Sequence, residues 1–174
     1  MTIGHAWKWA AAASLVAGCA SMGATGPQAT AKLAPTAGNQ TAGTVTFTPN
    51  GDRVRVLAQI SGLASGSHGF HIHEKGDCRA PDATSAGGHF NPGSQPHGNP
   101  AAGAHHAGDM PMLVADASGH ATLDATLSSI SLGSGANGIV GRSVVVHKDP
   151  DDFKSQPAGN SGARVACGVI VAAS

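Results

Sequence analysis

Six histidines and one aspartate in the middle and late chain are spaced in a way that few folds can satisfy. Two of them, in His71-Ile72-His73, are two residues apart and would project from the same face of an extended strand. Imidazole nitrogen binds both copper and zinc, and an added carboxylate suits zinc. Seven ligands are too many for one tetrahedral ion, which indicates two ions, or two ions that share a ligand. The set that the fold must gather is His71, His73, His89, His97, His106, Asp109 and His147.

Short alternating segments between glycine-rich turns predict an all-β domain. The chain of 174 residues holds 25 glycines and 10 prolines, and charged residues make up 11% of it. Residues 44–48 alternate with period two, and Pro49-Asn50-Gly51-Asp52 is a hairpin signal before a second alternating run at 53–60. No segment has a sustained helical period, so we expect an antiparallel sandwich or barrel. Further strands are expected at 112–114, 121–127, 143–147 and 164–171.

Residues 83–110 form a long segment of Gly, Pro, Asn and His without a strand pattern. Loops of this length in compact domains are usually functional or disordered. Four of the candidate ligands lie in this segment, so bound metal is a reason for it to be ordered.

The first 19 residues have the pattern of an export signal. Lys8 supplies the positive start, residues 9–18 are short and apolar, and the segment ends in Leu15-Val16-Ala17-Gly18-Cys19. This ending resembles the bacterial lipobox, in which the cysteine is lipidated and becomes the mature N-terminus. The alternative is an ordinary signal peptide and a chance cysteine. Residues 20–28 are expected to be a flexible linker, and residues 29–174 the domain.

Cysteine usage agrees with export. The chain has three cysteines, and if Cys19 carries lipid, Cys78 and Cys167 remain as an even pair in an oxidising compartment. A bridge between them would close a loop of about 90 residues and stabilise the fold by about 4–5 kcal/mol on the chain-entropy model. Two free thiols are the alternative. The predicted location is the periplasm or cell envelope, with the membrane contacted only through the lipid on Cys19.

The charge balance argues against a nucleic-acid partner. Ten basic and ten acidic side chains give a formal net charge of zero, and the sequence has no basic patch or polybasic tether. No stretch after the N-terminus is long and apolar enough to span a bilayer. One domain is expected for this length, and the sequence leaves open whether it is a monomer or a homodimer.

The segments around the histidines resemble the copper,zinc superoxide dismutases. These segments occur in the family's order between about residues 29 and 171, and the signal and the short Gly76-Asp77-Cys78 spacing resemble the exported bacterial branch. The resemblance implies an eight-stranded antiparallel Greek-key β-barrel or sandwich with long metal-binding and electrostatic loops. The matching segments are residues 69–73, 76–78, 85–92, 97–98, 106–109, 141–147 and 162–170.

The resemblance also implies two ligand sets that share one imidazolate. Copper would be held by His71, His73, His89 and His147, and zinc by His89, His97, His106 and Asp109, with His89 bridging the two ions. His105 adjoins His106 and competes with it as a zinc ligand, although the His-Ala-Gly-Asp spacing favours His106.

Other positions match residues that support the metals. Asp151 matches the aspartate that links a copper ligand, here His71, to a zinc ligand, here His97, and the adjacent Asp152 is the alternative. Cys78 and Cys167 match the disulfide of the family.

The activity implied by the resemblance converts superoxide to dioxygen and hydrogen peroxide by alternate reduction and reoxidation of copper. Zinc has no redox chemistry and would keep His89 in place while His89 takes up and returns a proton. Arg164 matches the arginine that guides and holds the anion, and Lys75 and Lys148 are candidates to add to its field.

Two other functions compete with this one. The first is a non-enzymatic copper- and zinc-binding protein on the same fold, which would typically lack a copper ligand or the arginine. The second is a zinc hydrolase, which would need an open zinc position and a general base.

Overall fold

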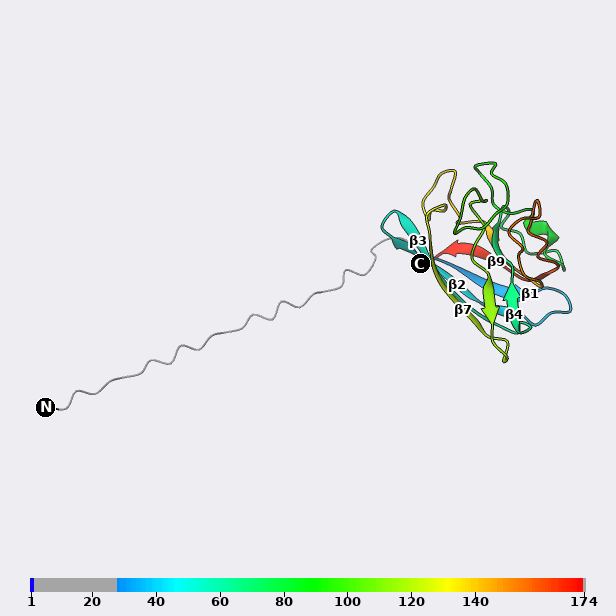
Figure 1. Cartoon of the computed structure of the whole chain (residues 1–174), viewed down its shortest axis with the longest axis horizontal. Coiled ribbons are helices and arrows are strands. Elements are labelled where there is room, and N and C mark those ends of the chain that lie inside the picture. Colours follow the sequence, from blue (N-terminus) through cyan, green and yellow to red (C-terminus); the bar gives the residue numbers. More distant parts are fainter. Residues whose placement is uncertain (2–27, 174) are drawn as a thin grey trace.

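The computed structural model describes Met1 and residues 28–173. The predicted export signal, the lipobox with Cys19 and residues 20–27 of the predicted linker lie outside the described residues. The described residues contain antiparallel strands and one short 3-10 helix, so the predicted all-β class is confirmed (Figure 1). The elements are β1 Ala29–Pro35, β2 Ala42–Asn50, β3 Arg53–Ser61, β4 Gly66–His68, β5 Phe70–His73, η1 Thr84–Ala86, β6 Leu113–Ala115, β7 Ala121–Leu127, β8 Ser143–His147 and β9 Arg164–Ala172.

Seven strands form one curled antiparallel sheet in the order β5-β8-β9-β1-β2-β3-β7, and β4 pairs with β6 in a second, smaller sheet. In Figure 1, β9 in red lies beside β1 in blue, because the two ends of the domain pair with each other. Gly69 alone separates β4 from β5, so this part of the chain passes from the small sheet to the edge of the large one. If β4 and β5 are counted as one path, the fold has the expected eight strands of a Greek-key barrel.

The core follows from the alternation in the strands. In β3 the residues Val54, Val56, Ala58 and Ile60 are buried, while Arg53 and Arg55 are exposed. Burying a valine or isoleucine side chain contributes about 1.5–3 kcal/mol. This alternation therefore decides which face of β3 closes onto the interior.

Most of the predicted strands are present with nearly the predicted bounds, and those of β7 and β8 agree fully with the pattern. β1 and β4 were not singled out by the sequence. β1 does alternate between buried and exposed positions, but its buried side chains include Ala29 and Ala31, and alanine is a weak strand former. β4 has only three residues, with Ser67 and His68 in place of apolar side chains.

The predicted disulfide between Cys78 and Cys167 is present, with Cα atoms 5.7 Å apart. It attaches β9 to the segment that leads into η1, 89 residues earlier in the chain. Within residues 28–173, no helix has the length and apolarity needed to cross a bilayer.

Candidate metal centre

Strands β5 and β8 present three of the histidines. His71 and His73 lie on β5, which pairs with β8 so that His71 is opposite Val145 and His73 is opposite Ser143. His147 is the last residue of β8. The long loop reaches the same place through isolated bridges that join His71 to Asp109 and His73 to His89. The loop is therefore held against the strand that carries two of the ligands.

Two buried groups of side chains result, and they coincide with the two predicted sets. Within each group the ligand atoms all lie within 4.8 Å of one another. The first group is His71, His73, His89 and His147, and the second is His89, His97, His106 and Asp109.

In the first group, backbone carbonyls determine which ring nitrogens face the centre. His73 Nδ1 donates to the carbonyl of Gly87 at 2.9 Å, and His147 Nδ1 donates to the carbonyl of Gly162 at 3.1 Å. The Nε2 atoms of His73 and His147 are thereby left without protons, and they lie 3.5 Å apart. Two lone pairs at this separation fit ligands of one ion.

His71 and His89 complete this group with ring nitrogens that make no hydrogen bond. In the part of the chain that the structure describes, the buried side-chain atoms without a hydrogen-bond partner are His71 Nδ1, His89 Nε2 and His106 Nδ1. Buried polar atoms almost always have a partner, and each exception calls for an explanation. A metal ion supplies one, so these side chains fit copper and zinc as ligands.

In the second group, one carboxylate oxygen lies among three imidazoles. Asp109 Oδ1 is 2.9 Å from His89 Nδ1, 3.1 Å from His97 Nδ1 and 3.4 Å from His106 Nδ1. The other oxygen, Oδ2, accepts hydrogen bonds from the backbone N–H groups of Gly98 and His106. The carboxylate is therefore held in place, with one oxygen directed at the ring nitrogens.

His89 belongs to both groups. Its Nδ1 lies on the side of Asp109, and its unpartnered Nε2 lies on the opposite side of the same ring. One imidazole can therefore offer a nitrogen to each of two ions.

A second aspartate links one histidine of the first group to one histidine of the second group. Asp151 is buried, and its two oxygens accept from His71 Nε2 at 2.6 Å and from His97 Nε2 at 2.9 Å. This is the link expected of Asp151. The alternative, Asp152, is exposed and caps the backbone N–H groups of Lys154 and Ser155.

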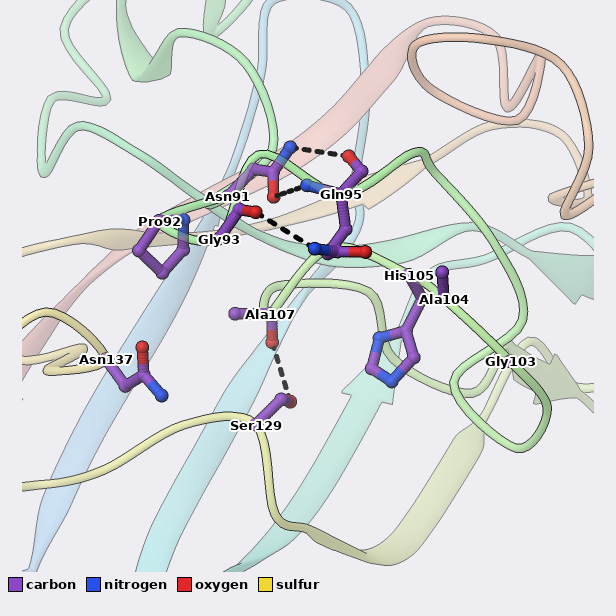
Figure 2. A pocket seen from close by; sticks show the side chains of 10 residues that line it. All are labelled: Asn91, Pro92, Gly93, Gln95, Gly103, Ala104, His105, Ala107, Ser129 and Asn137. Carbon is purple, nitrogen blue, oxygen red and sulfur yellow. Dashed lines mark hydrogen bonds between the residues drawn. The ribbon is translucent and has the colours of Figure 1, made fainter.

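His105 lies outside both groups. Its Nδ1 is 2.7 Å from the carbonyl oxygen of His106, and its ring forms part of the wall of a separate pocket of about 330 Å³ (Figure 2). Asn91 and Gln95, which are joined by two hydrogen bonds, also line that pocket (Figure 2). The arrangement favours His106 over His105 as the metal ligand.

Burial gives these side chains the protonation states that metals need. Burial lowers the pKa of His71 and His73 well below the usual value, and lowers that of His147 to about 4. Burial alone would raise the pKa of Asp109, but hydrogen bonds from His89 and from two backbone N–H groups hold it at about 2. At neutral pH these three rings are therefore neutral and the carboxylate is charged, as metal binding requires.

Arg164 stands beside the first group in an open cavity. The cavity has a volume of about 320 Å³, and His73, His89, His147 and Arg164 are among its lining residues. The guanidinium donates at 2.7 Å from each of two nitrogens, to the carbonyls of Ala83 and Gly87. Burial lowers the pKa of Arg164, but a guanidinium still stays charged at neutral pH. The cavity thus presents a fixed positive charge to a small anion.

The sequence profile of the copper/zinc superoxide dismutases matches residues 41–170. The chain belongs to this family. It is 40% identical to a Cu-Zn superoxide dismutase of Deinococcus radiodurans over 167 residues, which cover 88% of each protein. It is 43% identical to an extracellular Cu-Zn superoxide dismutase of Caenorhabditis elegans over 134 residues, or 74% of this chain and 60% of that protein. The chain is thus a superoxide dismutase, and copper and zinc are its metals.

Three residues that support the site of this superoxide dismutase were not predicted from the sequence. The buried ring of His68 lies between two carbonyl oxygens, those of His147 and Ala64, at 2.9 and 2.8 Å. Gln156 contacts the backbone of His97, and Gly159 packs against Asp151. The Gly-Phe-His motif that follows His68 was a usable signal for that residue, whereas neither Gln156 nor Gly159 lies next to a ligand in the sequence.

Proposed function

We propose that the two histidine groups are the metal sites of this superoxide dismutase. Copper would be held by His71 Nδ1 and by the Nε2 atoms of His73, His89 and His147. Zinc would be held by Asp109 and by the Nδ1 atoms of His89, His97 and His106. The observation that carries this proposal is the shared ring of His89, with one nitrogen facing each group.

The chain's own residues have separate tasks in dismutation. Arg164 attracts superoxide and holds it in the cavity that His73 and His147 also line. His89 Nε2 is the nitrogen that can hold a proton and release it to the reduced product. Asp151 keeps His71 and His97 in one orientation while this proton moves. When bound, copper supplies the one-electron chemistry that takes two superoxide ions to dioxygen and hydrogen peroxide.

The two competing functions lack support from these residues. A non-enzymatic metal-binding relative is expected to lack a copper ligand or the arginine, and both are present here. A zinc hydrolase needs an open zinc position, but four donors already satisfy a tetrahedral zinc.

Replacing one ligand and one neighbouring histidine tests the assignment. We expect His147→Ala to lose copper, measured by metal analysis and by the copper spin-resonance spectrum, and to lose superoxide removal, while zinc stays bound. His105→Ala is the matched control and should keep both metals and full activity. Copper retention and normal activity in His147→Ala would remove His147 from the site.

We infer further that the protein is exported and anchored through lipid on Cys19. The lipobox-like ending of the first 19 residues and a disulfide within the domain support this inference. One relative is named as extracellular. Both tryptophans, Trp7 and Trp9, precede Cys19, so the processed protein should have no tryptophan emission.

Cellular fractionation tests the anchor. We expect the wild-type protein in the membrane fraction, with a mass that includes lipid on Cys19, and Cys19→Ser in the soluble fraction or unprocessed. Tryptophan emission from purified wild-type protein would show that the signal is retained and would argue against lipid attachment at Cys19.

A further inference from the structure

Segment 149–162, which follows β8, contacts His97 at two places. Through Asp151 it accepts a hydrogen bond from the His97 ring at 2.9 Å. Through Gln156 it contacts the His97 backbone, which lies in the long loop without regular secondary structure. The ring contact was expected of Asp151 from the sequence, while the backbone contact comes from a residue that no motif indicated.

The amide of Gln156 forms a closed pair with the His97 backbone. Its Oε1 accepts from the His97 N–H at 2.9 Å, and its Nε2 donates to the His97 carbonyl at 2.9 Å. Nε2 also donates to the carbonyl of Lys154 at 3.2 Å, so both of its hydrogens are used. Only one orientation of the amide satisfies these three contacts, because a flipped amide would place its oxygen against two carbonyls.

We propose that Gln156 is a positioning residue that fixes the backbone of His97 and, with it, the wall of the substrate cavity. The next two residues along the chain, Pro157 and Ala158, line the cavity that also contains His147 and Arg164. Fixing Gln156 therefore determines where this wall stands. The same contact holds His97 so that its Nδ1 faces Asp109 at 3.1 Å.

The contact has a distinct physical role beside that of Asp151. A backbone N–H and C=O in an irregular loop need partners, and here a side chain supplies both in the way that a neighbouring strand would. Asp151 contacts the His97 ring, whereas Gln156 contacts both polar groups of the His97 backbone. Outer partners of metal ligands contribute about 10- to 100-fold to metal affinity.

Gln156→Glu is the sharpest test, since it keeps the size and one acceptor but places a carboxylate oxygen against the carbonyls of His97 and Lys154. We expect its zinc dissociation constant, measured by chelator competition in the copper-loaded protein, to rise about tenfold. With cobalt in the zinc position, its visible spectrum should change, and amide exchange across residues 149–162 should accelerate. Gln95→Glu is the matched control, because Gln95 lies in the long loop that contains His97, but among described residues its side chain donates a hydrogen bond only to the carbonyl of Gly93.

A zinc constant and cobalt spectrum in Gln156→Glu equal to those of Gln95→Glu would overturn the assignment of Gln156. Since the inference rests on His97 as a zinc ligand, His97→Ala belongs in the same series: if that variant keeps its zinc, the ligand set itself is wrong. If Gln156→Glu does not fold, Gln156→Met removes the polar atoms without adding charge and should show the same weaker zinc binding. Unchanged zinc binding in Gln156→Met would equally refute the role of Gln156.

Discussion

Arg164 and His73 donate to the same acceptor, the carbonyl oxygen of Gly87. Arg164 Nη2 lies 2.7 Å from that oxygen and His73 Nδ1 lies 2.9 Å from it. One peptide group therefore sets both the position of the guanidinium and the ring orientation of a proposed copper ligand. The positive charge and the proposed metal site are held at a constant separation because they share this anchor.

Replacing Arg164 should slow dismutation without releasing copper. We expect the rate constant for superoxide to fall about 10-fold or more in Arg164→Ala, because charge steering raises association rates by about 10- to 1000-fold. Arg164→Lys should recover only part of the loss, since an ammonium group cannot reproduce the fork that reaches both Ala83 and Gly87. Pulse radiolysis at several salt concentrations measures the effect.

The salt dependence separates steering from a structural defect. The wild-type rate should decline with ionic strength, and the Arg164→Ala rate should decline less. Full activity with unchanged salt dependence in Arg164→Ala would eliminate the steering role. Lys154→Ala, which removes an exposed cation in the neighbouring loop, is a useful comparison.

Gly159→Ala should disrupt the link between the two metal groups. A Cβ at Gly159 would overlap Asp151 Oδ1 and lie 2.6 Å from His97 Nε2. We expect displacement of Asp151 and weaker zinc binding, measured by chelator competition. Gly51→Ala is the matched control: its φ of +63° is close to the +66° of Gly159, but nothing lies within 4 Å of the added carbon.

Comparing Gly159→Ala with Gly51→Ala separates the overlap with Asp151 from the strain of an alanine at positive φ. Both alanines should cost about 1–2 kcal/mol of stability from positive φ alone. Only Gly159→Ala should also lose zinc. Equal zinc affinity in the two variants would mean that Asp151 does not need its present position.

The metal-free protein should lose stability as the pH falls from about 6.5 to about 4. Burial lowers the folded-state pKa of His147 to about 4, against 6.5 for an ordinary histidine, so the unfolded chain binds more protons in this window. The shift of His147 alone corresponds to about 3 kcal/mol that is present above pH 6.5 and lost as the pH approaches 4. His71 and His73 shift in the same direction.

Urea unfolding of the chelator-treated protein at pH 7 and at pH 4.5 measures this effect. His147→Gln should reduce the difference between the two pH values, while His120→Gln, at an exposed turn, should not. A stability that stays constant over this range would show that these rings are not buried as neutral imidazoles without metal.

Removing the disulfide should destabilise the fold by about 4–5 kcal/mol, the chain-entropy value for a loop of this length. The bond joins Cys167, three residues after Arg164 on β9, to the segment that leads to the carbonyls of Ala83 and Gly87. We therefore expect the double variant Cys78→Ser/Cys167→Ser to lose activity at temperatures where it is still folded. Denaturant unfolding and an activity assay on the same sample check both effects, and a loss below about 1 kcal/mol would contradict the chain-entropy account.

Local patterns in the sequence were enough for much of the fold and for the choice of candidate ligands. Period-two alternation located β2 and β3, and β3 buries one face and exposes the other. Short segments between turns located β7, β8 and β9, and β8 is buried along its whole length. The spacing in His71-Ile72-His73 placed two rings on one side of a strand, as the structure has them. Binding of copper and zinc by these residues stays a prediction until metals are measured.

Other features could not be predicted because they depend on contacts between distant segments. β1 was missed since its buried alanines give a weak signal, and it becomes a strand by pairing with β2 and β9. Gln156 is an exposed residue of an irregular loop, and it gains its role from His97, 59 residues earlier. Nothing in the sequence near Gln156 or near His97 predicts the contact between them.

The sequence by itself determined the candidate ligand side chains and the strands that carry three of them, because side-chain chemistry and strand patterns act within a few residues. Only the tertiary structure decided which nitrogen of each ring faces the centre. That choice is made by acceptors from distant parts of the chain, such as the carbonyl of Gly87 for His73 and the carboxylate of Asp151 for His71. A ring that donates from one nitrogen can offer only the other to a metal, so the packing of remote backbone oxygens sets the geometry of the site.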